Sequence, residues 1–466
     1  MTDASPSDAA RSSSGPRALD EATLREYVTV MRDLLAHGGF ERTGDVLAAK
    51  KWDFDHITRW LDAHGRPDRR RTIHVAGSKG KGSVASMAAS ILNAAGAHTL
   101  LMTSPDLHSA RERIQVDGAP LDYAEFAAVA RELLAEPDVA GWSYFEMLTV
   151  MGWMAGQRAG CDWQVVEVGL GGRLDTTNAL AEKLVAVVTP IDLEHVQILG
   201  DSIPAIAREK AGIITGPCEV VVPPMRQSAI DVVRDRAAEM GATFHALSDE
   251  CAIRVVSSGL DGQKLDVRTP VRTYRNLETT LAGAYQVDNL VTALRAAELA
   301  WASTGDELPE AAVRDGLRRF RMPGRFEVIQ RKPLTIIDGL HTPLAARRFL
   351  EGVRGLPVPR RRAWVLGVLS DKAVDQLADA LFEEGDDVIV VPAGSARSAA
   401  VADVVRAVNA TGAIAQRGSS VADGIDRASE MVGPGGAVLV VGSLYVAAAA
   451  REHLLGVAGD HALGLR

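Results

Sequence analysis

The amino-acid sequence predicts an α/β protein with two units, each built on a mostly parallel sheet. Short apolar runs alternate with helix-like stretches, which is the pattern of repeated βαβ units. The alternation breaks in the basic, Pro- and Gly-containing segment 319–333 and then resumes. A chain of 466 residues has room for two to three domains at about 150 residues each. We therefore expect one unit at 21–320 and a second at 321–466.

The first unit begins with apolar runs that read as buried strands. These are expected at 72–76, 164–168, 184–190 and 219–222, and helical patterns lie between them, including 83–94 and 144–157. Residues 252–276 differ, because two short runs flank the turn sequence Gly-Leu-Asp-Gly at 259–262, which predicts a β-hairpin. A helix is expected from about 285 to 303.

The second unit returns to parallel-strand patterns after the break. Its buried strands are expected at 334–338, 363–369, 387–391 and 437–441. About 140 residues are enough for a hydrophobic core of their own.

Composition and the ends of the chain exclude several classes of protein. The formal net charge is −9 and no basic patch stands out, so nucleic acid is not an expected partner. No apolar run approaches the ~20 residues that span a bilayer. Residues 1–20 are rich in Ser, Asp, Ala and Pro and are expected to be a disordered tail rather than a signal peptide. The three widely spaced cysteines form no metal or disulfide pattern, which is typical of a reducing, cytoplasmic compartment.

The segment 72–83 predicts a phosphate-binding loop between a strand and a helix. Gly77, Gly80 and Gly82 would let backbone N–H groups approach phosphates, and the helix N-terminus favours an anion. Lys81 could reach phosphate oxygens, and the hydroxyl of Ser83 could ligate Mg²⁺. The spacing differs from the common G-x-x-x-x-G-K-[ST] pattern, and a flexible basic turn is the plainer alternative. The loop alone does not distinguish a kinase from a ligase.

Three further residues are candidates for the same site. Glu167 ends an apolar strand before a Gly-rich turn, and the carboxyl ends of parallel strands are where α/β sheets bind ligands. An oxygen ligand there suits Mg²⁺, and a capped strand end is the alternative. His195 and Lys210, each taken alone, are more typical of a packed or surface histidine and of an exposed helix charge.

Nine segments in a fixed order carry a more specific signal. Together they resemble the folylpolyglutamate synthase/dihydrofolate synthase branch of the Mur ligase superfamily, from about residue 25 to 450. The segments are HVAGSKGKGS (74–83), TSPDLHSARERI (103–114), YFEMLTV (144–150), EVGLGGRLDTTN (167–178), DLEHVQILG (192–200), EKAGII (209–214), MPGRFEV (322–328), DGLHTP (338–343) and VGSLYV (441–446).

The resemblance implies a fold and a reaction. The fold is a P-loop parallel-sheet ATPase domain followed by a smaller Rossmann-like α/β domain. The reaction is ATP-dependent addition of L-glutamate to folate or dihydropteroate through an acyl-phosphate, with ADP and phosphate as products. ATP, two Mg²⁺ ions and small-molecule substrates are the implied ligands, and a monomer without membrane or nucleic-acid partners is expected.

The resemblance also implies a role for each matching residue. ATP would contact the loop residues Gly77, Ser78, Lys79, Gly80, Lys81, Gly82 and Ser83, together with Asn289, Arg325 and Asp338. Mg²⁺ would be held by Ser83, Glu167, His195 and Lys210, the last as a carbamate. Lys81, Lys210, Asp338 and His341 would be catalytic. The folate side would be lined by Ser104, Pro105, Arg113 and Phe145, and the amino acid would lie near Asp175, His341 and Ser443.

Five positions depart from the usual family pattern. They are Lys79 in the phosphate loop, Glu194 before His195, Tyr285, Leu340 and Thr342. They leave the phosphate and metal residues intact but open a second hypothesis, the same ligase chemistry on a different carboxylate acceptor. A third hypothesis, a P-loop kinase or non-catalytic nucleotide-binding protein, would not need Glu167, His195 and Lys210 together.

Overall fold

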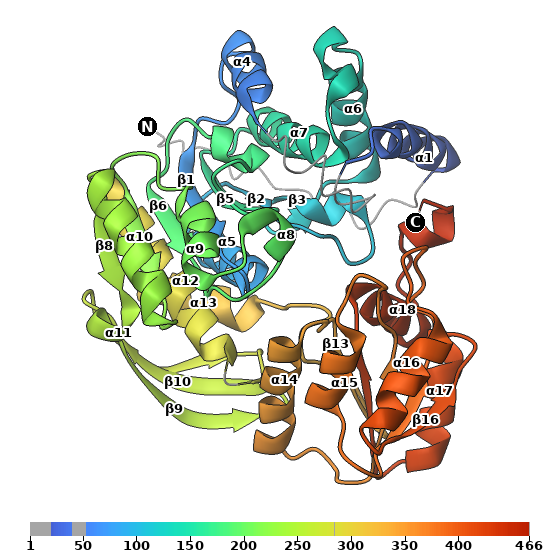
Figure 1. The fold of residues 1–466 in the computed structure, drawn as a ribbon. Helices are drawn as coiled ribbons and strands as arrows, with labels where there is room; N and C mark the ends of the chain where they lie inside the picture. The colour runs from blue at the N-terminus through green and yellow to red at the C-terminus, as the bar shows by residue number, and fades with distance from the viewer. Residues whose placement is uncertain (1–19, 40–52, 284, 466) are drawn as a thin grey trace, which may run out of the picture.

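A computed structural model describes residues 20–39, 53–283 and 285–465 as two α/β lobes joined side by side (Figure 1). The expected tail therefore lies outside the described residues, except Asp20, whose carboxylate caps helix α1 (Glu21–Ala36). The larger lobe contains an eight-stranded sheet and a three-stranded sheet, and the smaller lobe contains a six-stranded sheet. The fold class expected from the sequence is confirmed.

The eight-stranded sheet has the order β4-β3-β2-β5-β1-β6-β7-β8. In this order, the six strands from β2 across the sheet to β8 are all parallel to one another. Strands β3 and β4 add an antiparallel edge next to β2, which the sequence did not predict. The strands are β1 (Arg71–Ala76), β2 (Thr99–Met102), β3 (Ile114–Val116), β4 (Ala119–Pro120), β5 (Trp163–Glu167), β6 (Val185–Val188), β7 (Glu219–Val222) and β8 (Thr243–Ala246).

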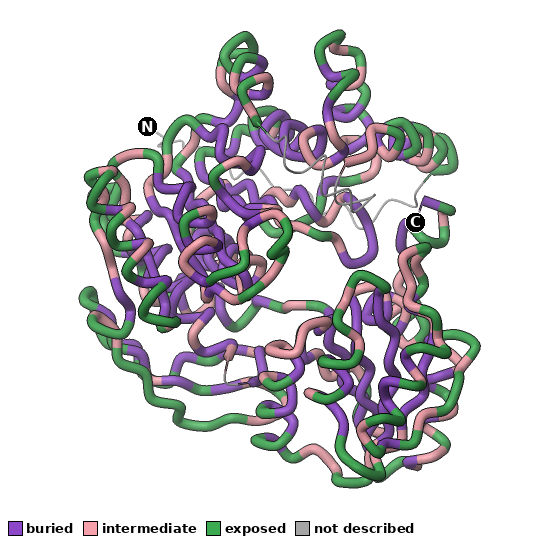
Figure 2. The backbone as a smooth tube through the Cα atoms, viewed as in Figure 1, coloured by how far each residue is buried: buried purple, intermediate pink, exposed green. Residues whose placement is uncertain are grey.

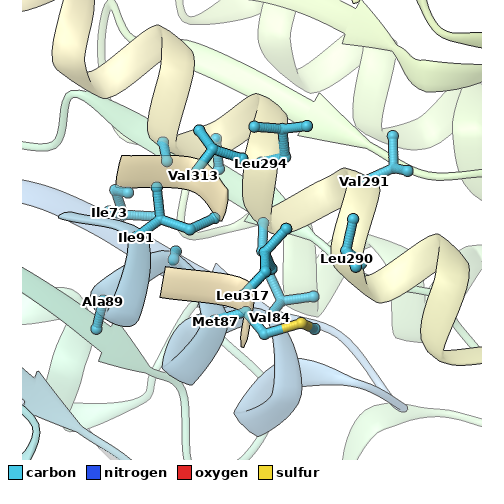
Figure 3. Close-up of a cluster of buried hydrophobic side chains, with 14 of the residues drawn as sticks. Ile73, Val84, Met87, Ala89, Ile91, Leu290, Val291, Leu294, Val313 and Leu317 are labelled. Carbon is cyan, nitrogen blue, oxygen red and sulfur yellow. The ribbon is translucent and has the colours of Figure 1, made fainter. Parts of the chain in front are cut away.

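Helices cover both faces of this sheet. Helix α5 packs against α12 and α13, and Figure 3 shows Met87 and Ile91 of α5 among Leu290, Leu294 and Leu317 from the other two. The helices of this lobe, besides α1, are α4 (Asp55–Ala63), α5 (Lys81–Ala94), α6 (Tyr123–Leu134), α7 (Tyr144–Ala159), α8 (Val196–Leu199), α9 (Ile203–Ala211), α10 (Gln227–Glu239), α11 (Leu247–Glu250), α12 (Tyr285–Trp301) and α13 (Glu310–Arg319).

The expected hairpin at 252–276 is present, but the prediction missed a third strand. Strands β9 (Ala252–Gly259), β10 (Gly262–Arg268) and β11 (Thr273–Thr279) form an antiparallel sheet in the order β11-β10-β9. Strand β9 is exposed along most of its length (Figure 2). In β11 the alternation of buried and exposed residues is broken where Asn276 adopts a φ of 51°, which hides the strand pattern.

The smaller lobe has the strand order β12-β13-β17-β14-β15-β16, and only β12 runs antiparallel. Its strands are β12 (Glu327–Arg331), β13 (Leu334–Asp338), β14 (Arg362–Leu366), β15 (Asp387–Val390), β16 (Ile414–Arg417) and β17 (Ala437–Val441). Its helices are α14 (Pro343–Gly355), α15 (Val374–Leu381), α16 (Val401–Ala410), α17 (Val421–Val432) and α18 (Leu444–Leu455). Buried residues run along the inner strands β13, β14, β15 and β17, whereas the edge strands β12 and β16 and the outer sides of the helices carry exposed residues (Figure 2).

Candidate active site between the two lobes

The loop between β1 and α5 has the backbone that close approach to phosphate requires. Gly77 has a φ of 140°, and a Cβ on it would lie 1.8 Å from Oγ1 of Thr189. Gly80 has a φ of 89°, and its Cβ would lie 2.4 Å from Oδ1 of Asn289. Both positions therefore exclude a side chain. Asn289, expected on the nucleotide side, lies directly against this loop.

The first turn of α5 faces the carboxylate at the end of β5. A Cβ on Gly82 would lie 3.3 Å from Oε2 of Glu167, and the same oxygen accepts a hydrogen bond of 3.0 Å from the backbone N of Ser104. Burial raises the pKa of Glu167, and the nearby charge of Lys81 opposes that rise. Ser83 is buried one position further along α5. A carboxylate and a hydroxyl thus flank the phosphate loop.

Lys210 is buried beneath the phosphate loop rather than exposed on its helix. Its side chain is 2% exposed, and Nζ donates to the carbonyl of Gly77 (2.8 Å) and to Oε1 of Glu194 (2.9 Å). The second oxygen of Glu194 accepts from Nζ of Lys79 at 3.4 Å. Two residues that depart from the family pattern, Lys79 and Glu194, are therefore paired with each other.

The titration of these groups follows from burial and from their neighbours. Burial lowers the pKa of Lys210 to about 8, although Glu194 favours its charged form. Burial alone would raise the pKa of Glu194, but Lys210, Lys81 and Lys79 outweigh it and hold that pKa at about 2. A lysine with a lowered pKa offers more neutral amine at neutral pH than an exposed one.

His195 begins the short helix α8 in a left-handed conformation, with a φ of 44°. Burial lowers its pKa to about 4, and the positive charges of Lys372, Lys210 and Lys81 act in the same direction against the negative charge of Glu194. The imidazole is therefore neutral at neutral pH, which is the form that ligates metals.

Asp338 is the last residue of strand β13 in the smaller lobe, and His341 lies in the loop that follows it. Asp338 is buried and accepts from the backbone N of Phe326 and of Leu340, both at 2.8 Å. Its carboxylate also interacts with the phenol of Tyr285, which comes from the larger lobe, and with the charge of Arg325. Asp338 therefore ties the segment that carries Arg325 to the start of α12.

His341 is held by its own backbone. Its Nδ1 lies 3.1 Å from the carbonyl of Gly339, so Nδ1 donates and Nε2 remains an acceptor. Burial, followed by the charges of Lys79 and Lys372, lowers the pKa of His341 to about 3. This histidine is therefore neutral at neutral pH, and its Nε2 can accept a hydrogen bond.

Several residues expected to contact substrates also have local structural roles. Asp175 is buried and accepts from the backbone N of Leu170 (2.8 Å) and of Thr177 (3.0 Å), which fixes the Gly-rich turn after β5. Ser443 caps α18 through the backbone N of Val446 (3.2 Å).

The expected folate side is organised around that same turn. A Cβ on Gly169 would lie 2.5 Å from Cζ of Phe145, so the phenyl ring lies directly on the turn. Arg113 is buried, and its Nε donates to Oδ1 of Asp106 at 2.6 Å. The peptide bond between Ser104 and Pro105 is cis.

One cavity of about 2670 Å³ collects nearly all of the predicted residues from both lobes. Pockets for a single small ligand usually measure about 300–1,000 Å³, so this space suits more than one substrate. Gly77 and Lys210 do not line it, and Glu194 lies at the wall in front of Lys210.

Sequence reasoning missed a charged group on the smaller lobe. Asp371 pairs with Lys372 (2.8 Å) and with Arg397 (3.1 Å), and all three line the cavity. A usable signal was present, because Asp371 and Lys372 closely follow the carboxyl end of β14, where parallel sheets place their ligands.

No preassembled metal cluster is found among residues 20–39, 53–283 and 285–465. No three His, Cys, Asp or Glu side chains gather there as a metal site. Mg²⁺ usually takes only one or two carboxylates and completes its shell with substrate phosphates and water, so Ser83 and Glu167 beside the phosphate loop fit such an ion. In the described part of the chain, no helix has both the length and the apolar character to cross a membrane.

Comparison with known proteins agrees with this arrangement. Residues 75–297 match the Mur ligase middle domain, and residues 324–444 match the glutamate ligase domain of Mur ligases. The chain is 31% identical to the folylpolyglutamate synthase of Lacticaseibacillus casei over 425 residues, which are 88% of this chain and 96% of that protein.

Two further relatives extend the comparison. A probable bifunctional folylpolyglutamate synthase/dihydropteroate synthase of Haloferax volcanii is 33% identical over 85% of this chain, which spans only 48% of that protein. The crystal structure of Mycobacterium tuberculosis folylpolyglutamate synthase complexed with ADP and AMPPCP has a TM-score of 0.83 and 31% identity, covering 94% of this chain and 100% of that one. The two domain matches, the full-length relative and the shared fold agree: this chain is an ATP-dependent C–N ligase that belongs to the folylpolyglutamate synthase/dihydrofolate synthase family of Mur ligases.

Proposed function

We propose that this chain uses ATP to add L-glutamate to a folate-type carboxylate, as a monomer in the cytoplasm and without nucleic acid as a partner. The observation that carries the proposal is the single cavity that joins the phosphate loop of the larger lobe to Asp338, His341 and Ser443 of the smaller lobe. A ligase needs three substrates in one place, whereas a nucleotide-binding module does not.

The first step activates the acceptor. A carboxylate oxygen of the acceptor attacks the γ-phosphorus of ATP, the bond from phosphorus to the bridging oxygen of ADP breaks, and an acyl-phosphate forms. Charge spreads over the transferred phosphoryl group, and Lys81 and the backbone N–H groups at the start of α5 would stabilise it. When bound, Mg²⁺ would neutralise phosphate charge, with Ser83, Glu167, His195 and carbamylated Lys210 as the proposed ligands.

The second step forms the amide. The neutral amino group of glutamate attacks the acyl carbon, the bond from that carbon to the phosphate oxygen breaks, inorganic phosphate leaves, and the nitrogen loses one proton to the released phosphate or to water. In this proposal Asp175, His341 and Ser443 lie near the amino acid, and the acceptor atom Nε2 of His341 can hold the amine. Arg325 and Asn289 would contact ATP. The acyl-phosphate must be kept from water, which closure of the smaller lobe over the larger one would achieve.

The folate side would lie along the wall of the cavity that Phe145 and the 104–113 segment form. The ring of Phe145 lies beside the Gly-rich turn, and Ser104, Pro105 and Arg113 form the neighbouring wall. An aromatic ring and a buried arginine suit a flat heteroaromatic acid.

A phosphate-release assay with a panel of acceptors tests the proposal. Purified protein receives ATP, Mg²⁺ and L-glutamate with dihydropteroate, tetrahydrofolate or a peptidoglycan-type carboxylate. We expect ADP and phosphate to form only when a pteroate-type acceptor and glutamate are both present. AMP as the stoichiometric product would exclude the acyl-phosphate route, and turnover with the peptidoglycan-type acceptor alone would move the chain to a different substrate class.

A further inference from the structure

The segment after α18, residues 457–465, leaves the smaller lobe and packs onto the larger one. Figure 1 shows the short helix η5 (Asp460–Leu463) beside α1 rather than against the six-stranded sheet. Leu465 is buried in the core that includes Tyr27 of α1 and Phe126 of α6, and Leu463 packs against that core. We call residues 457–465 the C-terminal segment.

Asp460 makes the polar contacts of this segment. The residue is 3% exposed, and its carboxylate accepts from the hydroxyl of Tyr27 at 2.9 and 3.0 Å and from the backbone N of Ala110 at 2.9 Å. Its own backbone N donates to the carbonyl of His108 at 2.8 Å. Burial raises the pKa of Asp460, and the bond from Ala110 is the first contact that opposes the rise. Asp460 therefore binds the 104–113 loop at two residues, His108 and Ala110.

The smaller lobe holds the same loop from its other side. Leu107 is buried in a core cluster of that lobe, among residues of α17 and α18. Nδ1 of His108 lies 3.4 Å from Oε1 of Glu452, and Nε of Arg451 donates to Nε2 of His108 at 3.1 Å. A loop of the larger lobe is thus fixed by α18 and by the C-terminal segment together.

This loop is also a wall of the active site. It begins at Ser104, whose backbone N binds Glu167, and it ends at the buried side chain of Arg113. Between these ends, Glu112 accepts from the backbone N of Leu107 (2.8 Å) and of His108 (3.1 Å), which closes the loop on itself. Because the loop is internally closed, a contact at Ala110 is transmitted to both ends.

We propose that Asp460 is a positioning residue for the acceptor: through Ala110 and Tyr27 it holds the 104–113 loop in the shape that binds the acceptor's ring system. The proposal rests on the proposed function only for the identity of the acceptor. It explains why a buried carboxylate from the smaller lobe is anchored by a tyrosine hydroxyl in the larger lobe, 433 positions away in the sequence.

The test compares Asp460→Ala, Tyr27→Phe and a chain that ends at Gly456 with the full-length protein. The backbone amide of Ala110 should exchange its hydrogen at least about tenfold faster in each variant. Asp460→Ala and the shortened chain remove the carboxylate that accepts from this amide, and Tyr27→Phe removes the hydroxyl that holds that carboxylate in place. The KM for the acceptor should rise about tenfold, whereas kcat and the KM for ATP should stay within about twofold. Asp460→Asn should recover part of the loss, because its side-chain oxygen still accepts from Ala110.

The matched control is Asp426→Ala, which removes an exposed carboxylate that pairs with His453 on α18 (2.8 Å). It should change neither exchange at Ala110 nor any KM. Unchanged exchange and unchanged acceptor KM in Asp460→Ala and in the shortened chain would overturn the proposal, and so would an equal rise in the KM for ATP. If the full-length protein does not use a pteroate-type acceptor, the proposed function fails, but the exchange rate of Ala110 still decides the role of Asp460 in the loop.

Discussion

Nζ of Lys210 lies 2.9 Å from Oε1 of Glu194, and this ion pair is buried directly beneath the phosphate loop. Glu194 lines the cavity and Lys210 does not, so the carboxylate separates the amine from the substrates. A carbamylated Lys210 would be an anion and would repel Glu194. Nζ of Lys79 already lies 3.4 Å from the other oxygen of Glu194. Lys79 can therefore remain the ion-pair partner of Glu194 when the carboxylate turns away from a carbamylated Lys210.

Replacement of Lys210 by alanine tests the carbamate. We expect Lys210→Ala to lower the rate of phosphate release by about 100-fold or more, since an anion that organises metal and phosphate charge is lost. Formate or acetate should partly restore the rate by occupying the vacated position. The fold should persist, because Glu194 keeps Lys79 as a partner.

The matched control for this prediction is Arg208→Ala, which removes an exposed cation from the same helix and should leave the rate unchanged. Full activity of Lys210→Ala without added acid would contradict the carbamate. The plainer interpretation of Lys210 as an exposed helix charge is wrong, because Lys210 is buried on Glu194 and the neighbouring Glu209 pairs with Arg173 instead.

The pH dependence of activity should follow the amine of Lys210. Carbamylation consumes the neutral amine, and burial lowers the pKa of Lys210 from 10.5 to about 8. The neutral fraction therefore increases as the pH rises through about 8, two to three pH units below the value for an exposed lysine. Measured at a fixed concentration of dissolved CO₂, the initial rate should rise between pH 6.5 and 8.5 and then level off.

Added CO₂ provides the check on this pH profile. Raising CO₂ at pH 6.5 should increase the rate, whereas at pH 8.5 it should change the rate little. A rate at pH 6.5 that does not respond to CO₂ would show that the carbamate is absent or already complete, and would remove Lys210 as the titrating group.

Local sequence patterns predicted most of the fold because the strands are buried on both faces. The run at 437–441 is apolar throughout, the runs at 72–76 and 164–168 are apolar at three of five positions, and the structure places a parallel strand at each. Strand β11 was missed because its outer face carries Arg275 and Glu278 and its alternation breaks at Asn276. A half-exposed strand with a positive φ in its middle gives no clear period.

The site could be predicted where it follows from strand ends, and not where it depends on distant contacts. Glu167 and Asp338 end parallel strands, so their place in the cavity follows from topology. The pairing of Glu194 with both Lys79 and Lys210 depends on the left-handed turn at His195, which no propensity predicts. The contact of Asp460 with Tyr27 is set by tertiary packing alone.

Two lysines of the phosphate loop should differ strongly in importance. Lys81→Ala should reduce turnover by about 100-fold or more, since the loop loses its cation for the transferred phosphoryl group. Lys79→Asn should cost about tenfold or less, because Nζ of Lys79 is engaged with Glu194. Steady-state rates at saturating ATP measure both. Near-normal turnover of Lys81→Ala would remove the phosphate-loop assignment, and an equal loss in the two variants would mean that Lys79 also contacts phosphate.

The last prediction concerns Gly77 of the phosphate loop, which lies against Thr189 directly after β6. Gly77→Ala would place a Cβ 1.8 Å from Oγ1 of Thr189 at a φ of 140°, so the loop must move away from its present path. Gly96→Ala, just beyond the other end of the same helix, meets nothing within 4 Å at a φ of 93° and isolates the cost of backbone strain. That cost is about 1–3 kcal/mol.

We expect Gly96→Ala to lower the thermal midpoint by a few degrees and to bind ADP normally in calorimetry. Gly77→Ala should weaken ADP binding by about 100-fold or more, because the N–H groups that would face the phosphates are displaced. Equal ADP affinity in the two variants would show that the loop tolerates displacement and that its backbone does not hold the phosphates.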